Sequence, residues 1–193
     1  MRLILMGPPG AGKGTQAEVV ASRLGIAAIS TGDIFRRHAE LGSGLGRQAQ
    51  GYMEAGDYVP DEVTNAMVRE RLGEDDARPG FLLDGYPRTT AQVDELDGML
   101  CDLGSPLDAV VLLEVDGEEL IDRLLKRART ENRTDDTESV IRRRQEVFAE
   151  QTEPLVDVYE RRGLLVRVDG EGDVDEVLVR VLAALPERAG NGR

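Results

Sequence analysis

The sequence has no tryptophan, a single cysteine, Cys101, and a single histidine, His38. One cysteine excludes an intrachain disulfide and a cysteine-rich zinc site and fits a reducing compartment, and we expect Cys101 to be a small core residue on a helix. Aromatic residues make up only 4% of the chain, which argues against stacking on single-stranded nucleic acid. We expect His38 to be a solvated side chain rather than a catalytic base.

Basic residues and long apolar runs are also scarce. The chain has 24 Lys and Arg against 37 Asp and Glu, a formal net charge of -13 at pH 7. This balance argues against binding to nucleic acid or to anionic membranes, because both need a basic face. The opening apolar run, residues 3–6, is too short for a signal peptide, and no later run is long enough to span a bilayer. We therefore expect a cytoplasmic protein, and we expect it to be a monomer.

The strongest motif lies in the first fifteen residues, MRLILMGPPGAGKGT. The apolar run at 2–6 predicts a buried parallel strand, and the turn after it has the spacing GxxxxGK of a phosphate-binding loop, or P-loop. Gly10 and Gly12 lack a Cβ, so the backbone can point N–H groups at an anion, and the helix that begins near Lys13 adds its positive dipole end. Gly14 stands where the general motif has a Ser or Thr that holds Mg²⁺.

Strand and helix patterns alternate along the rest of the chain. The later apolar runs that predict strands are 26–30, 81–83, 110–113 and 164–168. Alternation that begins at a P-loop predicts an α/β protein: one P-loop domain over 1–193, with a doubly wound parallel sheet of about five strands flanked by helices. Ligands of such sheets bind at the carboxyl ends of the strands. Asp84 ends one predicted strand and can orient a metal-bound water there.

Two stretches interrupt this pattern. Residues 30–59 are rich in glycine and predict a small helical insert that acts as a mobile flap, whose first helix Thr31 or Asp33 can cap. Residues 126–136 end in a polar stretch without helical periodicity and predict a short lid. We expect both segments to close over ligands.

Arginines recur at helical spacing in the second half of the chain. Arg123 and Arg127 are one turn apart and share one side of a predicted helix. Arg144 stands four residues after Val140 and four before Phe148, so it lies on the inward-facing stripe of its helix. An inward arginine needs an anionic partner, and the spacing leaves open whether this is a ligand or a carboxylate of the chain.

Together these motifs resemble the adenylate kinases, a family of nucleoside monophosphate kinases (NMP kinases), from Met1 to about Leu185. The matching segments are GPPGAGKGTQ at 7–16, STGD at 30–33, GFLLDGYPR at 80–88, RLLKR at 123–127 and RTDD at 133–136. The resemblance implies reversible transfer of the γ-phosphoryl group from MgATP to AMP, giving two ADP, and so a role in adenine nucleotide homeostasis. It also implies Mg²⁺ as cofactor and an NMP-binding flap at 30–59, and it makes glycine normal at position 14, because the metal is held mostly through water.

The resemblance also assigns roles to particular residues. The implied ATP-binding residues are Gly10, Ala11, Gly12, Lys13, Gly14, Thr15, Arg127 and Gly172. The implied AMP-binding residues are Thr31, Arg36, Asp57, Tyr58, Val59, Gly85, Tyr86, Pro87, Arg88, Gln92, Arg133 and Arg144. The implied catalytic residues are Lys13, Arg88, Arg123, Arg133 and Arg144. Asp84 and Asp33 are expected to hold Mg²⁺ through water, and the stretch between Arg127 and Asp136 is too short for the zinc-binding lid of many bacterial relatives, so no zinc is expected.

The implied reaction needs no general base, because a phosphate acceptor is already ionised at neutral pH. Catalysis then depends on placement and charge neutralisation, for which planar guanidinium groups suit better than lysines. One alternative is a UMP/CMP kinase, although in those relatives alanine usually matches Thr31 and asparagine usually matches Gln92. Another is a nucleotide-binding switch, but the guanine-reading motif Asn-Lys-x-Asp is missing from the chain.

Overall fold

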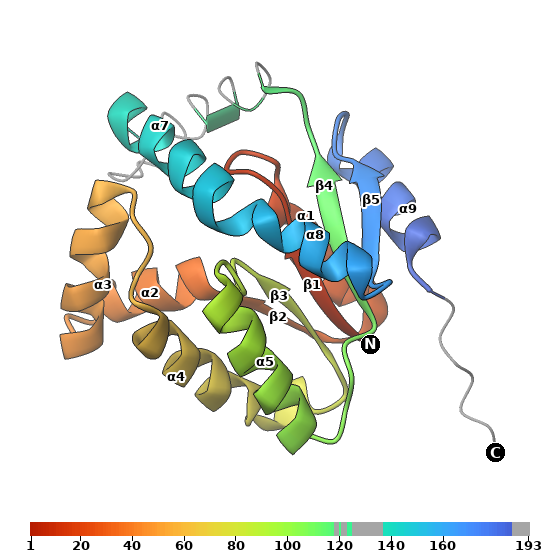
Figure 1. The fold of residues 1–193 in the computed structure, drawn as a ribbon, viewed down its shortest axis with the longest axis horizontal. Coiled ribbons are helices and arrows are strands. Elements are labelled where there is room, and N and C mark those ends of the chain that lie inside the picture. Colours follow the sequence, from red (N-terminus) through yellow and green to blue (C-terminus); the bar gives the residue numbers. More distant parts are fainter. Residues whose placement is uncertain (118–119, 121–122, 125–136, 187–193) are drawn as a thin grey trace.

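The computed structural model describes residues 1–117, 120, 123–124 and 137–186. Its centre is a parallel five-stranded sheet in the order β2-β3-β1-β4-β5, flanked by helices (Figure 1). The strands are β1 (Arg2–Met6), β2 (Ala27–Ser30), β3 (Phe81–Asp84), β4 (Ala109–Glu114) and β5 (Leu165–Asp169). The predicted fold class, a parallel α/β sheet of about five strands flanked by helices, is confirmed.

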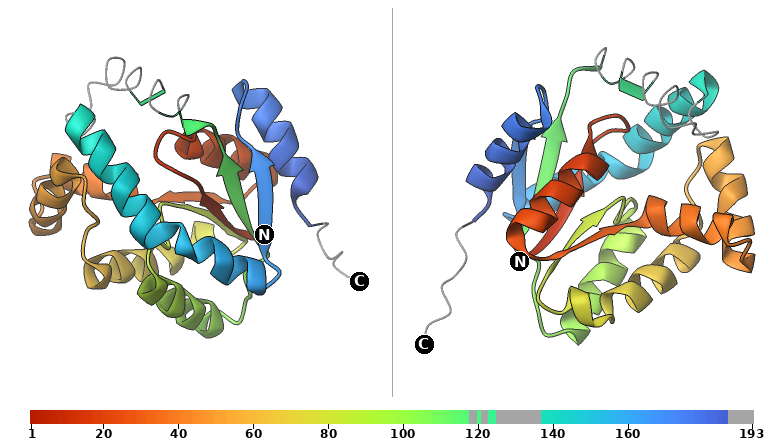
Figure 2. Two further views of the ribbon diagram at one scale, coloured as in Figure 1. Left: turned by 45° about the horizontal axis from the view of Figure 1, so that its top comes forward. Right: turned by 180° about the vertical axis from the view of Figure 1, so that it is seen from behind.

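Helices cover both faces of the sheet, so its strands are apolar on both sides. On one face lie α1 (Lys13–Leu24) and α9 (Val174–Ala184), seen in front of the sheet in the right panel of Figure 2. The helices α4 (Asp61–Leu72), α5 (Thr90–Asp102) and α8 (Pro154–Arg161) cover the other face. Alternate residues of β1 serve the two cores: Leu3 and Leu5 pack with α1 and α9, whereas Ile4 and Met6 pack with α4, α5 and α8.

Two further helices, α2 (Thr31–Glu40) and α3 (Gly44–Ala55), pack against each other at one side of the sheet (Figure 1). Phe35 of α2 and Ala49 of α3 form a small core together with Val59 and with Met67 of α4. Ser30 caps α2, because its hydroxyl accepts a hydrogen bond from the Asp33 N–H at 3.3 Å. The expectation that Thr31 or Asp33 supplies this cap is wrong.

A long helical segment crosses the sheet after residue 137. It consists of α7 (Glu138–Val147), a π-helical turn η2 (Phe148–Thr152) and α8. A π-helical turn shifts the side chains that follow it and is often found at functional sites. Here the turn places Phe148 and Thr152 on the side that faces the carboxyl ends of the central strands, where both line the cavity described below.

The remaining described elements are short or lie at the periphery. A 3₁₀ turn, η1 (Asp75–Ala77), leads into β3. Cys101 lies near the end of α5 and is exposed, so the expectation of a core cysteine is wrong. Among the helices of the described residues, none is both long and apolar enough to cross a membrane.

Candidate active site

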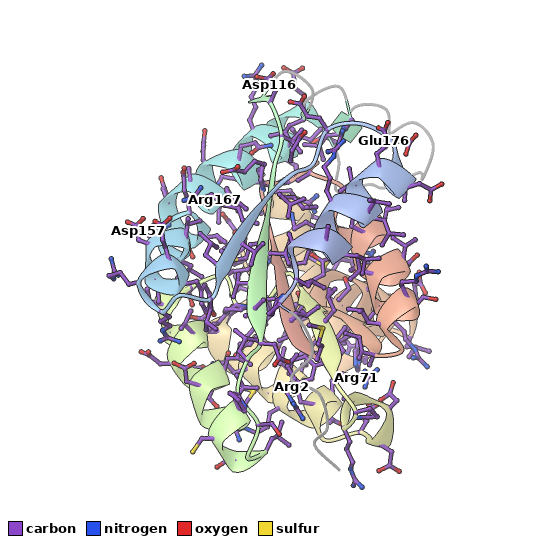
Figure 3. The ribbon with its side chains drawn as sticks, turned by 90° about the vertical axis from the view of Figure 1, so that its right-hand side faces the viewer. Arg2, Arg71, Asp116, Asp157, Arg167 and Glu176 are labelled. Carbon is purple, nitrogen blue, oxygen red and sulfur yellow. The ribbon has the colours of Figure 1, made fainter. Side chains whose placement is uncertain are left out.

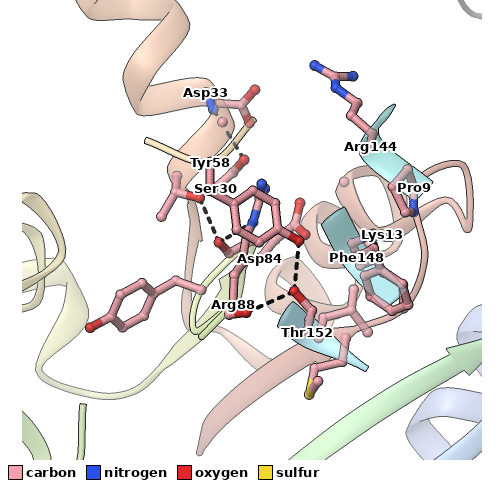
Figure 4. Close-up of a pocket in the computed structure, with 18 of the residues that line it drawn as sticks. Pro9, Lys13, Ser30, Asp33, Tyr58, Asp84, Arg88, Arg144, Phe148 and Thr152 are labelled. Atoms are coloured by element: carbon pink, nitrogen blue, oxygen red, sulfur yellow. Dashed lines mark hydrogen bonds between the residues drawn. The ribbon is translucent and has the colours of Figure 1, made fainter. Parts of the chain in front are cut away.

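A cavity of about 660 Å³ opens at the carboxyl ends of β1, β2 and β3 (Figure 4). Segments far apart in the sequence line it: the turn after β1, the start of α2, the loop between α3 and α4, the end of β3, and the helical segment from α7 to η2. Its volume is typical of a site for a small molecule. This cavity therefore lies at the edge of the sheet where parallel α/β proteins bind ligands.

The turn after β1 follows a course that only glycine tolerates. Gly10 and Gly12 have φ angles of 92° and 81°, in the left-handed region. A Cβ at Gly10 would lie 2.8 Å from the Leu120 carbonyl oxygen, so position 10 also needs the small residue for packing. Gly12 directly precedes α1, so the positive end of this helix dipole points into the turn. This geometry is that of an anion-binding loop.

Lys13 lies over this turn at the mouth of the cavity. Its ammonium group donates hydrogen bonds to the carbonyl oxygens of Gly7 and Pro8, at 2.7 and 2.9 Å. Gln145 of α7 donates from its side chain to the Pro9 carbonyl at 3.0 Å, which ties the tip of the turn to the helix across the cavity. The lysine is therefore held beside the site where an anion would sit.

Asp84 ends β3 next to the turn. It pairs in register with Leu5 of β1, and its Oδ2 would lie 3.8 Å from a Cβ built on Gly14. Burial raises the pKa of the Asp84 carboxyl, while the charge of Lys13 acts in the opposite direction. A carboxylate oxygen is a donor that Mg²⁺ prefers, so Asp84 is one residue that could hold this cation, although no three His, Cys, Asp or Glu side chains of the described residues are grouped as a metal site. The other expected metal residue, Asp33, forms an ion pair with Arg36.

Gly85 brings two polar side chains together just beyond β3. The Thr31 hydroxyl and the Arg88 Nε both donate to its carbonyl oxygen, at 3.0 and 2.7 Å. A Cβ at position 85 would lie 2.6 Å from the Thr31 hydroxyl, and the φ angle of 80° is unfavourable for any side chain. Glycine is therefore required for Thr31 and Arg88 to meet at this point.

Arg88 is further oriented by Tyr58 and Thr152. Its guanidinium carbon lies 4.8 Å from the centre of the Tyr58 ring, a cation–π contact. The hydroxyls of Tyr58 and Thr152 are 2.7 Å apart, and Thr152 donates to the Arg88 carbonyl at 2.9 Å (Figure 4). Tyr58 comes from the loop between α3 and α4, so this chain of contacts connects that loop to the loop after β3 and to η2.

Among the described residues, four arginines from different segments line the cavity: Arg36, Arg88, Arg123 and Arg144. Arg123 donates to the Gly170 carbonyl at 3.2 Å, and one of its terminal nitrogens would lie 3.9 Å from a Cβ on Gly12. It therefore lies directly above the glycine-rich turn. The inward position predicted for Arg144 agrees with its place in the cavity wall, on the far side from Asp33 in Figure 4.

Charged residues elsewhere project from the outer surface, as Arg167, Asp157 and Glu176 do in Figure 3. Arg167, for example, forms ion pairs with Glu114 and Glu160. A protein of strongly negative net charge thus has a cavity wall that contains several arginines.

Most residues proposed from the sequence lie in the cavity wall. The members that line it are Gly10, Gly12, Lys13, Gly14, Thr15, Thr31, Asp33, Arg36, Asp57, Tyr58, Val59, Asp84, Gly85, Tyr86, Pro87, Arg88, Gln92, Arg123 and Arg144. Ala11 and Gly172 are not in the wall: Ala11 is buried under the turn, and Gly172 precedes α9. Arg127, Arg133 and the predicted lid at 126–136 lie outside the described residues.

Some residues at the site were missed by the sequence analysis. Thr152 and Gln145 contact the cavity segments through hydrogen bonds, and Asp61 bonds to Gln92 behind the wall. The sequence carries no local signal for these contacts, because each joins residues distant along the chain. His38 was expected to be solvated, but it is half-buried and its Nδ1 lies 3.1 Å from the Ser43 hydroxyl, away from the cavity.

Comparison with known proteins agrees with this geometry. A family model described as adenylate kinase matches residues 5–164. The chain belongs to the adenylate kinase family. An adenylate kinase from a Nocardioides species is 62% identical over 185 residues, which cover 96% of this chain and 97% of that protein. Adenylate kinases from Thermobifida fusca and Kocuria rhizophila are both 59% identical, over 98% and 95% of this chain and 100% and 98% of theirs. Family membership makes the protein a transferase of the NMP kinase class.

Proposed function

We propose that the protein transfers the γ-phosphoryl group of MgATP to AMP and forms two ADP, in a reversible reaction. The observation that carries the proposal is the meeting of four arginines and the P-loop lysine around one cavity. Two polyanionic nucleotides repel each other, and cationic groups on several sides can hold them in line for transfer. We further propose that the protein acts in the cytoplasm as a monomer that maintains the adenine nucleotide balance.

The ATP phosphates would bind at the glycine-rich turn. Backbone N–H groups of residues 10–15 and the ammonium of Lys13 are suited to this anion. Arg127 and the Gly172 backbone are proposed to complete the ATP site on the basis of the family resemblance. AMP would bind on the other side of the cavity, where Thr31, Arg36 and Arg88 lie.

The phosphoryl group would pass between these two sites. Arg123 faces the cavity from the side of the glycine-rich turn, and Arg144 faces it from α7. We propose that Arg133 joins them. Guanidinium groups stabilise charge that spreads over the phosphoryl oxygens in the transition state. Asp84 and Asp33 would hold Mg²⁺ through water, and the ion, when bound, would neutralise part of the phosphate charge.

Water competes with AMP as an acceptor, so the site has to close during transfer. The insert at 30–59 and the lid at 126–136 are proposed to close over AMP and ATP respectively. Contacts that support closure by the insert are already present, because Tyr58 reaches Thr152 and Asp57 forms an ion pair with Arg143 of α7 at 2.8 Å.

The direct test measures ADP formation from ATP with AMP, UMP, CMP or GMP as acceptor, in parallel and with Mg²⁺ present. We expect AMP to be used with the highest kcat/KM. Faster use of UMP or CMP would establish the pyrimidine kinase instead. Consumption of ATP at a rate independent of any acceptor would support a hydrolytic switch and refute the proposal.

A further inference from the structure

The side-chain amide of Gln92 is held in one orientation behind the cavity wall. Gln92 lines the cavity and is only 1% exposed. Its Oε1 accepts a hydrogen bond from the Arg88 backbone N–H at 2.7 Å, and its Nε2 donates to Asp61 Oδ1 at 2.6 Å. A backbone N–H can only donate and an ionised carboxylate can only accept, so these two partners determine which end of the amide is oxygen and which is nitrogen.

Asp61 is itself fixed by a second contact. Its other carboxylate oxygen accepts from the Thr89 hydroxyl at 2.8 Å, and the same hydroxyl accepts from the Gln92 backbone N–H at 3.2 Å. Thr89 caps α5, and Asp61 is the first residue of α4. The ends of two helices thus form a closed ring of hydrogen bonds around the amide, and the ring cannot be satisfied if the amide flips.

The orientation of an amide decides which purine edge it can pair with. A primary amide has two N–H donors and two acceptor lone pairs, and the contacts described use one of each. Adenine presents a 6-amino donor next to the N1 acceptor. A 6-oxopurine presents a carbonyl acceptor next to an N1–H donor, which is the reverse pattern and needs the flipped amide.

We propose that Asp61 is a positioning residue that sets the purine specificity of the site by locking the Gln92 amide in the orientation suited to adenine. This inference rests on the proposed function, and it takes Gln92, one of the AMP-binding residues that the family resemblance implies, as the residue that contacts the base of AMP. A flipped amide would set its NH₂ group against the Arg88 N–H and its oxygen against the Asp61 carboxylate. Both contacts would then be repulsive, so a 6-oxopurine nucleotide is rejected even where its shape fits.

The test compares kcat/KM for AMP with that for IMP, which has the 6-oxopurine edge without the extra amino group of GMP. Asp61→Ala removes the acceptor for Nε2 and leaves only the Arg88 N–H to hold the amide. We expect the preference for AMP over IMP to fall by about tenfold, because one unpaired or repulsive hydrogen-bonding contact no longer opposes the flip. Asp61→Asn keeps the shape of the side chain but adds an NH₂ group that can donate to the oxygen of a flipped amide, so we expect it also to lower the preference for AMP over IMP.

Glu62→Gln is the matched control. Glu62 is the next residue of the same helical turn and is exposed. The substitution therefore removes a negative charge from the start of α4 without touching Gln92, and the ratio should stay at the wild-type value. If Asp61→Ala lowers kcat/KM equally for AMP and IMP, the ratio of the two values is unchanged. That result would overturn the inference, since it would indicate a structural role only.

The proposed function and this inference can fail separately. If the wild-type protein does not phosphorylate AMP, the proposed function is refuted. If it does and Asp61→Ala keeps the wild-type ratio, only the locking role is refuted. Should Asp61→Ala not fold, hydrogen exchange of the Gln92 side-chain N–H groups in the wild-type protein decides. We expect exchange at least about tenfold slower than in free glutamine, and exchange at the free rate would overturn the inference.

Discussion

Replacement of Gly46 by alanine tests how closely α2 and α3 must approach. Gly46 is buried in the first turn of α3. A Cβ there would lie 2.1 Å from the His38 carbonyl oxygen and 2.4 Å from the Ala39 nitrogen. These are backbone atoms of α2, so no side-chain rotation relieves the clash and the two helices must separate. Overpacking of this kind costs about 1–3 kcal/mol of the free energy of unfolding.

Gly51→Ala provides the control within the same helix. Gly51 is exposed, and a Cβ there meets no atom within 4 Å. Alanine in an open helical position should raise the free energy of unfolding by about 0.5–1 kcal/mol. In urea unfolding, the free energy of unfolding should therefore fall in Gly46→Ala and rise in Gly51→Ala. The midpoint of thermal unfolding should likewise fall in the first variant and rise in the second.

Gly46→Ala should also affect the proposed AMP site. The loop after α3 carries Asp57 and Tyr58 into the cavity wall, so a shift of α3 displaces them. We expect Gly46→Ala to raise KM for AMP several-fold while KM for ATP stays near its wild-type value. A Gly46→Ala protein as stable as Gly51→Ala, with unchanged KM for AMP, would refute the argument that this glycine sets the helix separation.

Three further substitutions test the contacts around the cavity. Tyr58→Phe keeps the ring over Arg88 but removes the hydrogen bond to Thr152, a contact worth about 1 kcal/mol. Initial-rate assays should therefore give a KM for AMP about fivefold higher than that of the wild type. The same KM in both proteins would show that this hydrogen bond does not contribute to AMP binding. Asp84→Asn should weaken activation by Mg²⁺ about 10–100-fold in a titration of rate against free Mg²⁺, and an unchanged titration midpoint would exclude Asp84 from the metal site. Arg88→Lys keeps the charge but loses the planar fork, so kcat should fall about a hundredfold with the melting temperature unchanged, whereas full activity would mean that charge alone suffices.

The features predicted correctly from the sequence are those with strong local signals. The strand Phe81–Asp84 is a short apolar run that ends in a polar turn, and its burial on both faces follows from that composition. The turn with Gly10 and Gly12 could be located because only a glycine-rich segment between strand and helix permits this backbone. Local signals of this kind were enough to predict the order of strands and helices along the chain and the edge of the sheet at which a ligand binds.

The glycines of α3 show what such signals leave open. The glycine-rich composition of 30–59 predicted a mobile helical insert, but it gave Gly46 and Gly51 no separate roles. In the structure, both lie within one regular helix, and Gly46 serves close packing against α2. A glycine that allows two helices to approach cannot be distinguished in sequence from a glycine that loosens a loop, because the difference lies in the partner helix.

Contacts between distant segments could not be predicted from the sequence either, because they also depend on a partner elsewhere in the chain. Tyr58 meets Thr152, and Asp61 meets Gln92, only after the sheet has brought their helices together. The phase of the helix repeat did place Arg144 on the inward side. It could not specify the π-helical turn that follows, which directs Thr152 towards Arg88.

The way in which arginines are anchored explains how an acidic protein can offer a cationic cavity. On the exterior, Arg69 forms ion pairs with Glu95 and Asp102, so opposite charges offset each other at the surface. In the cavity wall, Arg36 forms an ion pair with Asp33, but Arg88 donates to the Gly85 carbonyl. A carbonyl dipole fixes the direction of a guanidinium group without cancelling its net charge, whereas a carboxylate does both. Orientation by a backbone carbonyl therefore keeps the positive charge of Arg88 available to phosphate groups, although the protein as a whole is negative.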